Sequence, residues 1–298
     1  MLTSRTGVSL LTLSLALSLA ACGGAGEESA DEATVSPDGR VTRDVETWSL
    51  ATDPYGGVDS GLTQYAWELA VSDCMEAQGQ GFEVVTYDWN LPPDPTHNAA
   101  GRRLFTEAIA AAYGYHTAPD PGDYARRLRE RDARSPTDPV WQTSFSTCAE
   151  QVTENPPVAV AEDSDIDILA LSGAEEPDVV EAAGAWRECM APQGIPDLPE
   201  RPEGMPGPTL SAEFGLDVID PVNGSDTNES VPVSSRELEV AVADARCWVS
   251  SGYRDAYYEA EWRNDYEFVE ANGSELAAQL ERDQQVTADL IAYIRNHA

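Results

Sequence analysis

Apolar residues recur at helical spacing along most of the chain beyond residue 60. In residues 62–78, for example, Leu62, Ala66 and Leu69 fall on one face of a helix. The same pattern predicts further helices over residues 102–113, 122–131, 139–151 and 177–190. Residues 82–89 are instead rich in β-branched and aromatic side chains, and prolines follow them, so this segment is predicted to be extended. We therefore expect a mainly α fold with short extended segments.

The longest helical pattern lies toward the C-terminus. Ser234 and Glu237 form a capping box, and the apolar period continues from there to about residue 271, with a bend expected at residues 250–252. Asn272 and Gly273 then favour a left-handed stop, after which a last helix runs to about residue 296. The sequence thus predicts a long C-terminal helical hairpin.

A different apolar run, over residues 7–19, follows a short start that carries Arg5. With about a dozen residues, this run is shorter than the roughly 20 that a membrane-spanning helix needs, and it is typical of a secretory signal. It ends in Leu19-Ala20-Ala21-Cys22, which resembles the lipobox of bacterial lipoproteins. The resemblance implies that residues 1–21 are removed and that Cys22 becomes the lipidated first residue. The alternative is an ordinary signal with a chance cysteine near its cleavage site.

Residues 22–46 connect this signal to the first apolar positions of the body. They are rich in Gly, Ala, Ser and acidic residues and contain little that could be buried. Such a composition is typical of a disordered spacer. We expect a tether of this kind, with order beginning near Val45 and Trp48.

Two copies of the pattern Cys-Met-x-x-Gln-Gly indicate an internal duplication. The first copy begins at Cys74 and the second at Cys189, and each ends a predicted helix ahead of a proline-containing segment. Each copy is followed later by one more helical cysteine, Cys148 or Cys247. We therefore expect two helical cysteine modules, residues 47–157 and 158–298, and the second of them carries the hairpin.

These four cysteines are expected to form two disulfides, because an even number of cysteines in an exported chain is typical of a disulfide framework. Three connectivities are possible, and spacing alone does not choose among them. If each copy is a folding unit, its two cysteines should join within it. This argument favours Cys74–Cys148 and Cys189–Cys247.

Composition narrows the classes of function. The chain has 53 acidic and 18 basic residues, which gives a formal net charge of -35. This charge argues against nucleic-acid binding and against wide contact with anionic lipid, and it favours cationic partners or divalent ions. All basic residues are arginine, as in many high-GC genomes, so a P-loop, a kinase-type lysine, a Schiff-base lysine and a Ser-x-x-Lys site are excluded.

A second resemblance rests on the two cysteine motifs and on Ala243-Asp244-Ala245-Arg246-Cys247 in the long helix. Together they are similar to uncharacterised lipoproteins of high-GC Gram-positive bacteria with paired Cys-Met-x-x-x-Gly motifs. The resemblance covers the two cysteine helices and the C-terminal hairpin. It implies a cell-surface location and a helical build, and it carries no activity.

No metal or cofactor site is expected. The histidines are His97, His116 and His297, and none has a cysteine or a second histidine at ligand spacing. The acidic residues 163–167 suggest a calcium loop, but Ile168 and Ala174 stand where an EF-hand requires Gly and Glu. We interpret this run, and the acidic loop at residues 223–229, as solvated segments.

Projection of the long helix at about 100° per residue places Asp244 and Asp255 on its core face. The two acids are too far apart for a glycosidase pair, roughly 16 Å against at most about 9.5 Å. Asp244 should accept hydrogen bonds or pair with an arginine, because an unpaired buried carboxylate is costly. The projection leaves Tyr253 and Tyr257 on an exposed charged face, which makes them the candidate partner contact. The alternative is that they pack against the last helix.

The function expected from these features is that of a membrane-anchored extracytoplasmic lipoprotein. It would act as a non-catalytic binding or accessory module for an envelope protein or a cell-wall partner. One alternative is a solute-binding protein of a transporter, although the alternating strand–helix pattern of two α/β lobes is missing. The other is an envelope hydrolase, for which the sequence shows no nucleophile or acid–base constellation.

Overall fold

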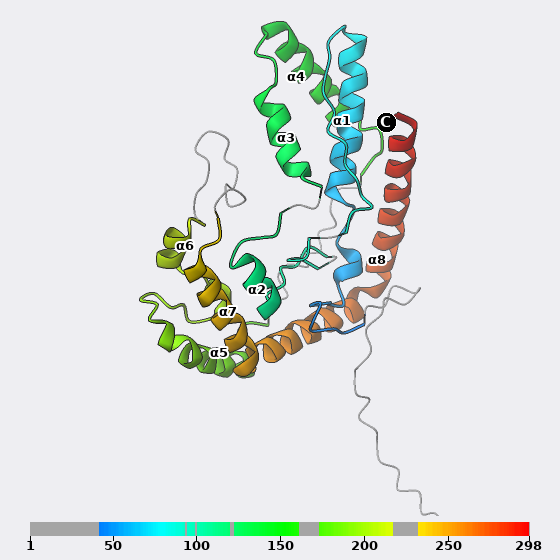
Figure 1. Cartoon of the computed structure of the whole chain (residues 1–298). Coiled ribbons are helices and arrows are strands. Elements are labelled where there is room, and N and C mark those ends of the chain that lie inside the picture. Colours follow the sequence, from blue (N-terminus) through cyan, green and yellow to red (C-terminus); the bar gives the residue numbers. More distant parts are fainter. Residues whose placement is uncertain are drawn as a thin grey trace, which may run out of the picture. The chain divides into compact units, whose positions relative to one another are not determined.

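The computed structural model describes residues 42–92, 94–98, 100–119, 122–160, 173–216 and 232–297. This part of the chain contains α-helices joined by loops and no β-strand (Figure 1). Its helices are α1 (Ser60–Ala77), α2 (Glu107–Tyr113), α3 (Tyr124–Ala133), α4 (Pro139–Glu154), α5 (Pro177–Met190), α6 (Pro208–Phe214), α7 (Ser235–Ser250) and α8 (Tyr253–His297). The mainly α class is therefore confirmed. All described residues belong to one compact unit, residues 31–298.

Several features of the sequence lie outside the described residues. They are the signal at residues 1–21, the lipidation site Cys22, the acidic run at 163–167 and the acidic loop at 223–229. The interpretations given for them stay predictions. Among the helices that the structure does describe, none is both long and apolar enough to cross a membrane.

Polar side chains bind the first free backbone amides of several helices. Those that accept such a bond are Asp59, Thr106, Asp138 and Ser234. The Ser234 hydroxyl accepts from the amide of Glu237 at 3.1 Å, as the capping box predicts. The Glu237 carboxylate is buried and instead accepts from the amide of Tyr115 at 2.9 Å. Ser234 of the capping box thus starts α7, whereas the Glu237 side chain joins α7 to the loop after α2.

The Cys74–Cys148 disulfide joins α1 to α4, with their Cα atoms 5.7 Å apart. Met75 of α1 is fully buried there in a cluster that also contains Trp141 and Val152 of α4. A second disulfide, Cys189–Cys247, joins α5 to α7 with the same Cα separation of 5.7 Å. The predicted pairing is confirmed at both sites.

The helices of the two expected modules also contact each other. α2 packs against α7, and α1 packs against α8. At the second contact, Leu62 and Leu69 are buried in one cluster with Leu290 and Ile294. The contacts show that the C-terminal helix contributes to the core around α1. The module boundary near residue 157 stays a prediction.

The predicted stop at Asn272 and Gly273 is wrong. α8 runs without interruption from Tyr253 to His297, and Figure 1 shows it continuing to a position beside α1. The Asn272 side-chain amide donates to the carbonyl of Phe268 at 2.8 Å, so this residue caps nothing and stays within the helix. The chain breaks instead at Ser251 and Gly252, where Gly252 adopts φ +77°. The expected bend is therefore the actual end of one helix and start of the next.

The two glycines give a direct test of this arrangement. In Gly273→Ala the new methyl group meets nothing within 4 Å, so the helix should gain stability by about 0.5–1 kcal/mol. In the matched variant Gly252→Ala the space is also open, but the positive φ should make the change destabilising by about 1 kcal/mol. Urea unfolding monitored by circular dichroism measures both. If Gly273→Ala were destabilising instead, the result would contradict a continuous helix and support a turn at this position.

Candidate functional site

A cavity of about 340 Å³ lies among segments that are far apart in the sequence. Residues 45–48, 102–106 and 202–205 supply parts of its wall, and Tyr115, α7 and α8 supply the remainder. Its aromatic lining residues are Trp48, Phe105, Tyr115, Trp248 and Tyr257. We call this space the aromatic cavity.

The rings around the aromatic cavity form a continuous series of contacts. In order of contact they are Trp48, Tyr257, Tyr253, Trp248, Phe105 and Tyr115. Neighbouring ring centroids are 5.6–5.9 Å apart, within the range in which aromatic pairs attract each other. We call this series the aromatic arc. It places ring faces and edges from loops and two helices around one space.

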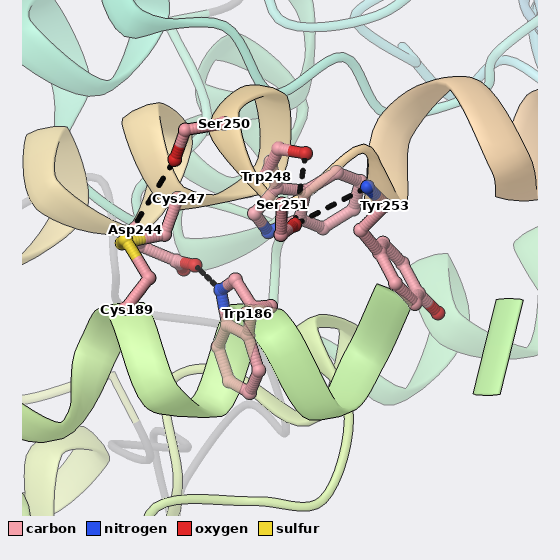
Figure 2. Close-up of a disulfide and its surroundings, with 8 residues drawn as sticks. All are labelled: Trp186, Cys189, Asp244, Cys247, Trp248, Ser250, Ser251 and Tyr253. Carbon is pink, nitrogen blue, oxygen red and sulfur yellow. Dashed lines mark hydrogen bonds between the residues drawn. A yellow bond between two sulfur atoms is a disulfide. The ribbon is translucent and has the colours of Figure 1, made fainter. Parts of the chain in front are cut away.

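Asp244 of α7 is the most deeply buried acid of the lining, with 1% of its surface exposed. One of its oxygens accepts from the Trp186 indole N–H at 2.8 Å, and the other accepts from the Tyr115 hydroxyl at 3.0 Å. Figure 2 shows Trp186 of α5 directed at Asp244 beside the Cys189–Cys247 disulfide. Burial raises the pKa of Asp244 to about 7, although these hydrogen bonds oppose the shift. The expectation that Asp244 accepts hydrogen bonds is confirmed.

Two further carboxylates of the lining also accept hydrogen bonds from the polar edges of the arc. Glu261 accepts from the Trp48 indole N–H at 2.8 Å, and Glu203 accepts from the Tyr253 hydroxyl at 2.5 Å. Burial raises the pKa of Glu261, and the bond from Trp48 offsets part of that effect. Within the described residues, neither acid forms an ion pair, and the same is true of Asp244. The oxygens of these three carboxyl groups are thus hydrogen-bonded to neutral donors.

The arginines of the lining differ in their pairing. Arg102 binds Asp53 at 3.1 Å and lies 3.6 Å from Asp265. Arg254 pairs with Glu46 at 2.9 Å and with its neighbour Asp255 at 3.1 Å. Each of these two guanidinium groups is therefore neutralised by carboxylates in the fold.

Arg103, the third arginine of the lining, keeps part of its surface exposed. It donates to the backbone carbonyl of Tyr115 at 2.5 Å, and it pairs with no carboxylate among the described residues. Burial lowers the pKa of the Arg103 guanidinium, and the group still carries a positive charge toward the cavity.

The end of the expected tether forms part of the wall. The Tyr258 hydroxyl of α8 accepts from the amide of Asp44 at 2.7 Å and donates to the carbonyl of Ser49 at 2.6 Å, which closes residues 44–49 into a loop. Within this loop Trp48 adopts φ +49°, a conformation that costs free energy in a residue with a bulky side chain. The strained backbone directs the Trp48 ring against Tyr257 and Tyr258. The described residues begin at Thr42, slightly before Val45, and the loop of residues 44–49 belongs to the candidate site.

The predicted exposed face at Tyr253 and Tyr257 is wrong. Tyr253 has 0% of its surface exposed and packs in a cluster with Val179 and Ala183 of α5, whereas Tyr257 is half-buried and lines the aromatic cavity. The projection also failed for Asp255, whose side chain is 69% exposed. The reason is the break at Gly252, because an angle counted along one helix does not continue into the next. The alternative, that these tyrosines pack inside the protein, is correct for Tyr253, but Tyr253 packs against α5 and not against the last helix.

Sequence reasoning identified Asp244 and the two tyrosines but missed Trp48, Phe105 and Glu261 as members of one site. No spacing pattern connects these residues, since they come from separate loops and helices.

No group of three His, Cys, Asp or Glu residues able to hold a metal ion occurs in the described ranges. No protein family, curated protein or solved structure compared with this chain matches it. The geometry of the cavity therefore carries the functional argument.

The buried Asp244 predicts a specific dependence of stability on pH. Its pKa is about 7 in the folded protein against an ordinary value of 3.8, so the folded state holds the proton more tightly than the unfolded state does. Its contribution to stability is complete below pH 4 and should be lost by about 1.4 kcal/mol per pH unit as the pH rises toward 7.

Asp244→Asn, which cannot ionise, should lack this loss, so its free energy of unfolding should rise relative to wild type between pH 4 and pH 7. Urea unfolding across this range measures the difference. Asp255→Asn removes a charge from an exposed position and controls for the change in overall charge. Parallel curves for wild type and Asp244→Asn would show that Asp244 is ionised in the fold throughout.

Proposed function

We propose that this protein is a non-catalytic binding module of the bacterial cell envelope. It is anchored by lipid on Cys22 at the outer face of the cytoplasmic membrane, and it holds a ligand in the aromatic cavity. The observation that carries the binding role is the cavity itself, with its aromatic arc and three carboxylates paired to neutral donors.

The size and lining of the cavity support this role. Its volume of about 340 Å³ falls at the lower end of the range for small-molecule sites, which runs from roughly 300 to 1,000 Å³. Such sites combine mainly apolar and aromatic walls with a few placed polar groups, as here. The polar groups are already positioned by hydrogen bonds within the wall, so they need little rearrangement when a ligand enters.

Two observations support the extracytoplasmic location. The disulfides Cys74–Cys148 and Cys189–Cys247 are of the kind that persists in oxidising compartments. The lipobox-like sequence lies close in the chain to the loop of residues 44–49, since Cys22 lies 21 positions before Arg43. A lipid on Cys22 would therefore keep the aromatic cavity close to the membrane surface.

The small volume favours a second candidate within the same location, a solute-binding protein of a transporter. A cavity of about 340 Å³ suits a free small molecule better than a strand of cell-wall polymer. The two candidates differ in what happens to the ligand, since a solute-binding protein releases it to a membrane partner. The third reading, an envelope hydrolase, gains no support from the cavity, because its acids are engaged as acceptors by the wall.

Lipid attachment is tested by labelling with a radioactive or alkyne-tagged fatty acid. We expect the wild-type protein to be labelled and to fractionate with membranes. Cys22→Ala should be unlabelled and either released or unprocessed, because the thiol that carries the lipid is gone. Label that survives in Cys22→Ala would contradict the anchoring proposal.

Ligand retention tests the binding role. The full-length protein is purified from membranes in detergent, and small molecules released on denaturation are analysed by mass spectrometry. We expect a compound retained by wild type and lost from Leu104→Trp, which fills the cavity that Leu104 lines. Leu91→Trp, at a side chain 41% exposed, is the matched control. Melting temperatures verify that both variants fold, and equal retention by all three proteins would contradict a role for this cavity.

A further inference from the structure

We propose that the ligand of the aromatic cavity is a small organic cation, a quaternary ammonium or a protonated amine. The proposal rests on the binding role proposed above and adds the chemical class of the ligand. It is drawn from the arrangement of ring faces, carboxylates and arginines around the cavity.

The aromatic arc is the first argument. The face of an aromatic ring carries partial negative charge and attracts a cation within about 6 Å of the ring centre, with indole the strongest of the three ring types. Trp48, Trp248 and Tyr257 line the cavity and belong to one contact series with neighbouring centroids 5.6–5.8 Å apart. A cation in this space can contact several rings at once. A neutral molecule of the same shape gains only the apolar contact.

The carboxylates strengthen this preference. Trp48 donates its indole N–H to Glu261, and Tyr253 donates its hydroxyl to Glu203. A hydrogen bond from the ring edge to a carboxylate pushes electron density into the ring, and the carboxylate itself adds negative potential at short range. Glu203, Asp244 and Glu261 form no ion pair within the described residues, so this potential is weakened only by the more distant Arg201 and Arg102 and by partial protonation of Asp244.

The arginines of the lining do not make the electrostatic potential in the cavity positive. Arg102 and Arg254 are each committed to carboxylates of the fold, at 3.1 Å from Asp53 and 2.9 Å from Glu46. Arg103 forms no ion pair in the described part of the chain, and burial lowers the pKa of its guanidinium. The lining therefore sets Glu203, Glu261 and a partly ionised Asp244 against the single unpaired guanidinium of Arg103. The formal net charge of -35 adds a long-range attraction for cations.

The volume limits the size of the ligand. Its volume of about 340 Å³ lies at the lower end of the range for small-molecule sites. A compact trimethylammonium or an aryl amine suits this volume better than a whole peptide or oligosaccharide. The competing ligand is a small carboxylate held by Arg103, and the experiment below includes it.

Three probes of similar size separate the possibilities in titration calorimetry with the full-length lipidated protein in detergent. Choline carries the cation, 3,3-dimethylbutan-1-ol is its uncharged isostere, and benzoate is an apolar anion. We expect choline to bind at least about tenfold more tightly than the isostere, because only the cation gains ring-face and carboxylate attraction. We expect no measurable binding of benzoate.

Variants that change a single charge of the lining test directly whether the ligand is a cation or an anion. Glu261→Gln keeps an acceptor for Trp48 and should weaken choline binding by about tenfold. Glu267→Gln, at an exposed position of the same helix, should leave it unchanged and controls for net charge. Arg103→Gln should strengthen choline binding, since it removes the unpaired cation of the lining. For an anionic ligand the effects of Arg103→Gln and Glu261→Gln would be opposite.

The outcomes separate this proposal from the proposed function. Equal affinity for choline and its isostere, tight binding of benzoate, or no binding of any probe would each overturn the assignment of a cation. If a probe other than choline binds and Leu104→Trp abolishes that binding, the cavity keeps its binding role with a different ligand class. Choline binding that survives Leu104→Trp would place the cation elsewhere and overturn the assignment to this cavity.

Discussion

The burial of the Asp244 carboxylate is the interaction on which the candidate site depends. A carboxylate removed from water must find donors in the fold or stay protonated. Here one oxygen accepts from Trp186 of α5 and the other from Tyr115, which follows α2. Because the donors belong to different elements, satisfying this one acid fixes α2, α5 and α7 relative to each other. The Cys189–Cys247 disulfide, one turn along α7, holds two of the same helices covalently.

Other buried acids are also satisfied within the fold, by arginine in some cases and by neutral donors in others. Glu68 of α1 pairs with Arg131 at 2.8 Å, Glu237 accepts from the backbone after α2, and Asp265 of α8 accepts from Thr52. In a chain with an excess of acids and few cations, carboxylates in the interior often meet neutral donors. Where such an acid is ionised and lines an open space, its negative charge adds to the electrostatic potential of that space. The aromatic cavity is such a space.

In the proposed role, the loop of residues 44–49 has two functions. Residues 44–49 are fixed to α8 by the Tyr258 hydroxyl, and they contribute Trp48 to the aromatic arc. The same loop is the link between the body and a lipid on Cys22. The position of a ligand and the attachment to the membrane thus meet in one short segment, and the strained backbone of Trp48 is maintained by the ring contacts that it makes.

The sequence by itself determined the structural features that depend on residues close together along the chain. Apolar period and capping residues located most helices, with α5 matched at both ends, and the repeated cysteine motif paired Cys74 with Cys148 and Cys189 with Cys247. Tertiary packing decided the rest. Asn272-Gly273 is a local stop signal, yet burial of Leu276, Leu290 and Ile294 favours one continuous helix, and the break falls at Gly252 instead. The aromatic cavity was beyond sequence reasoning for the same reason, because its wall joins residues whose only relation is contact in the folded chain.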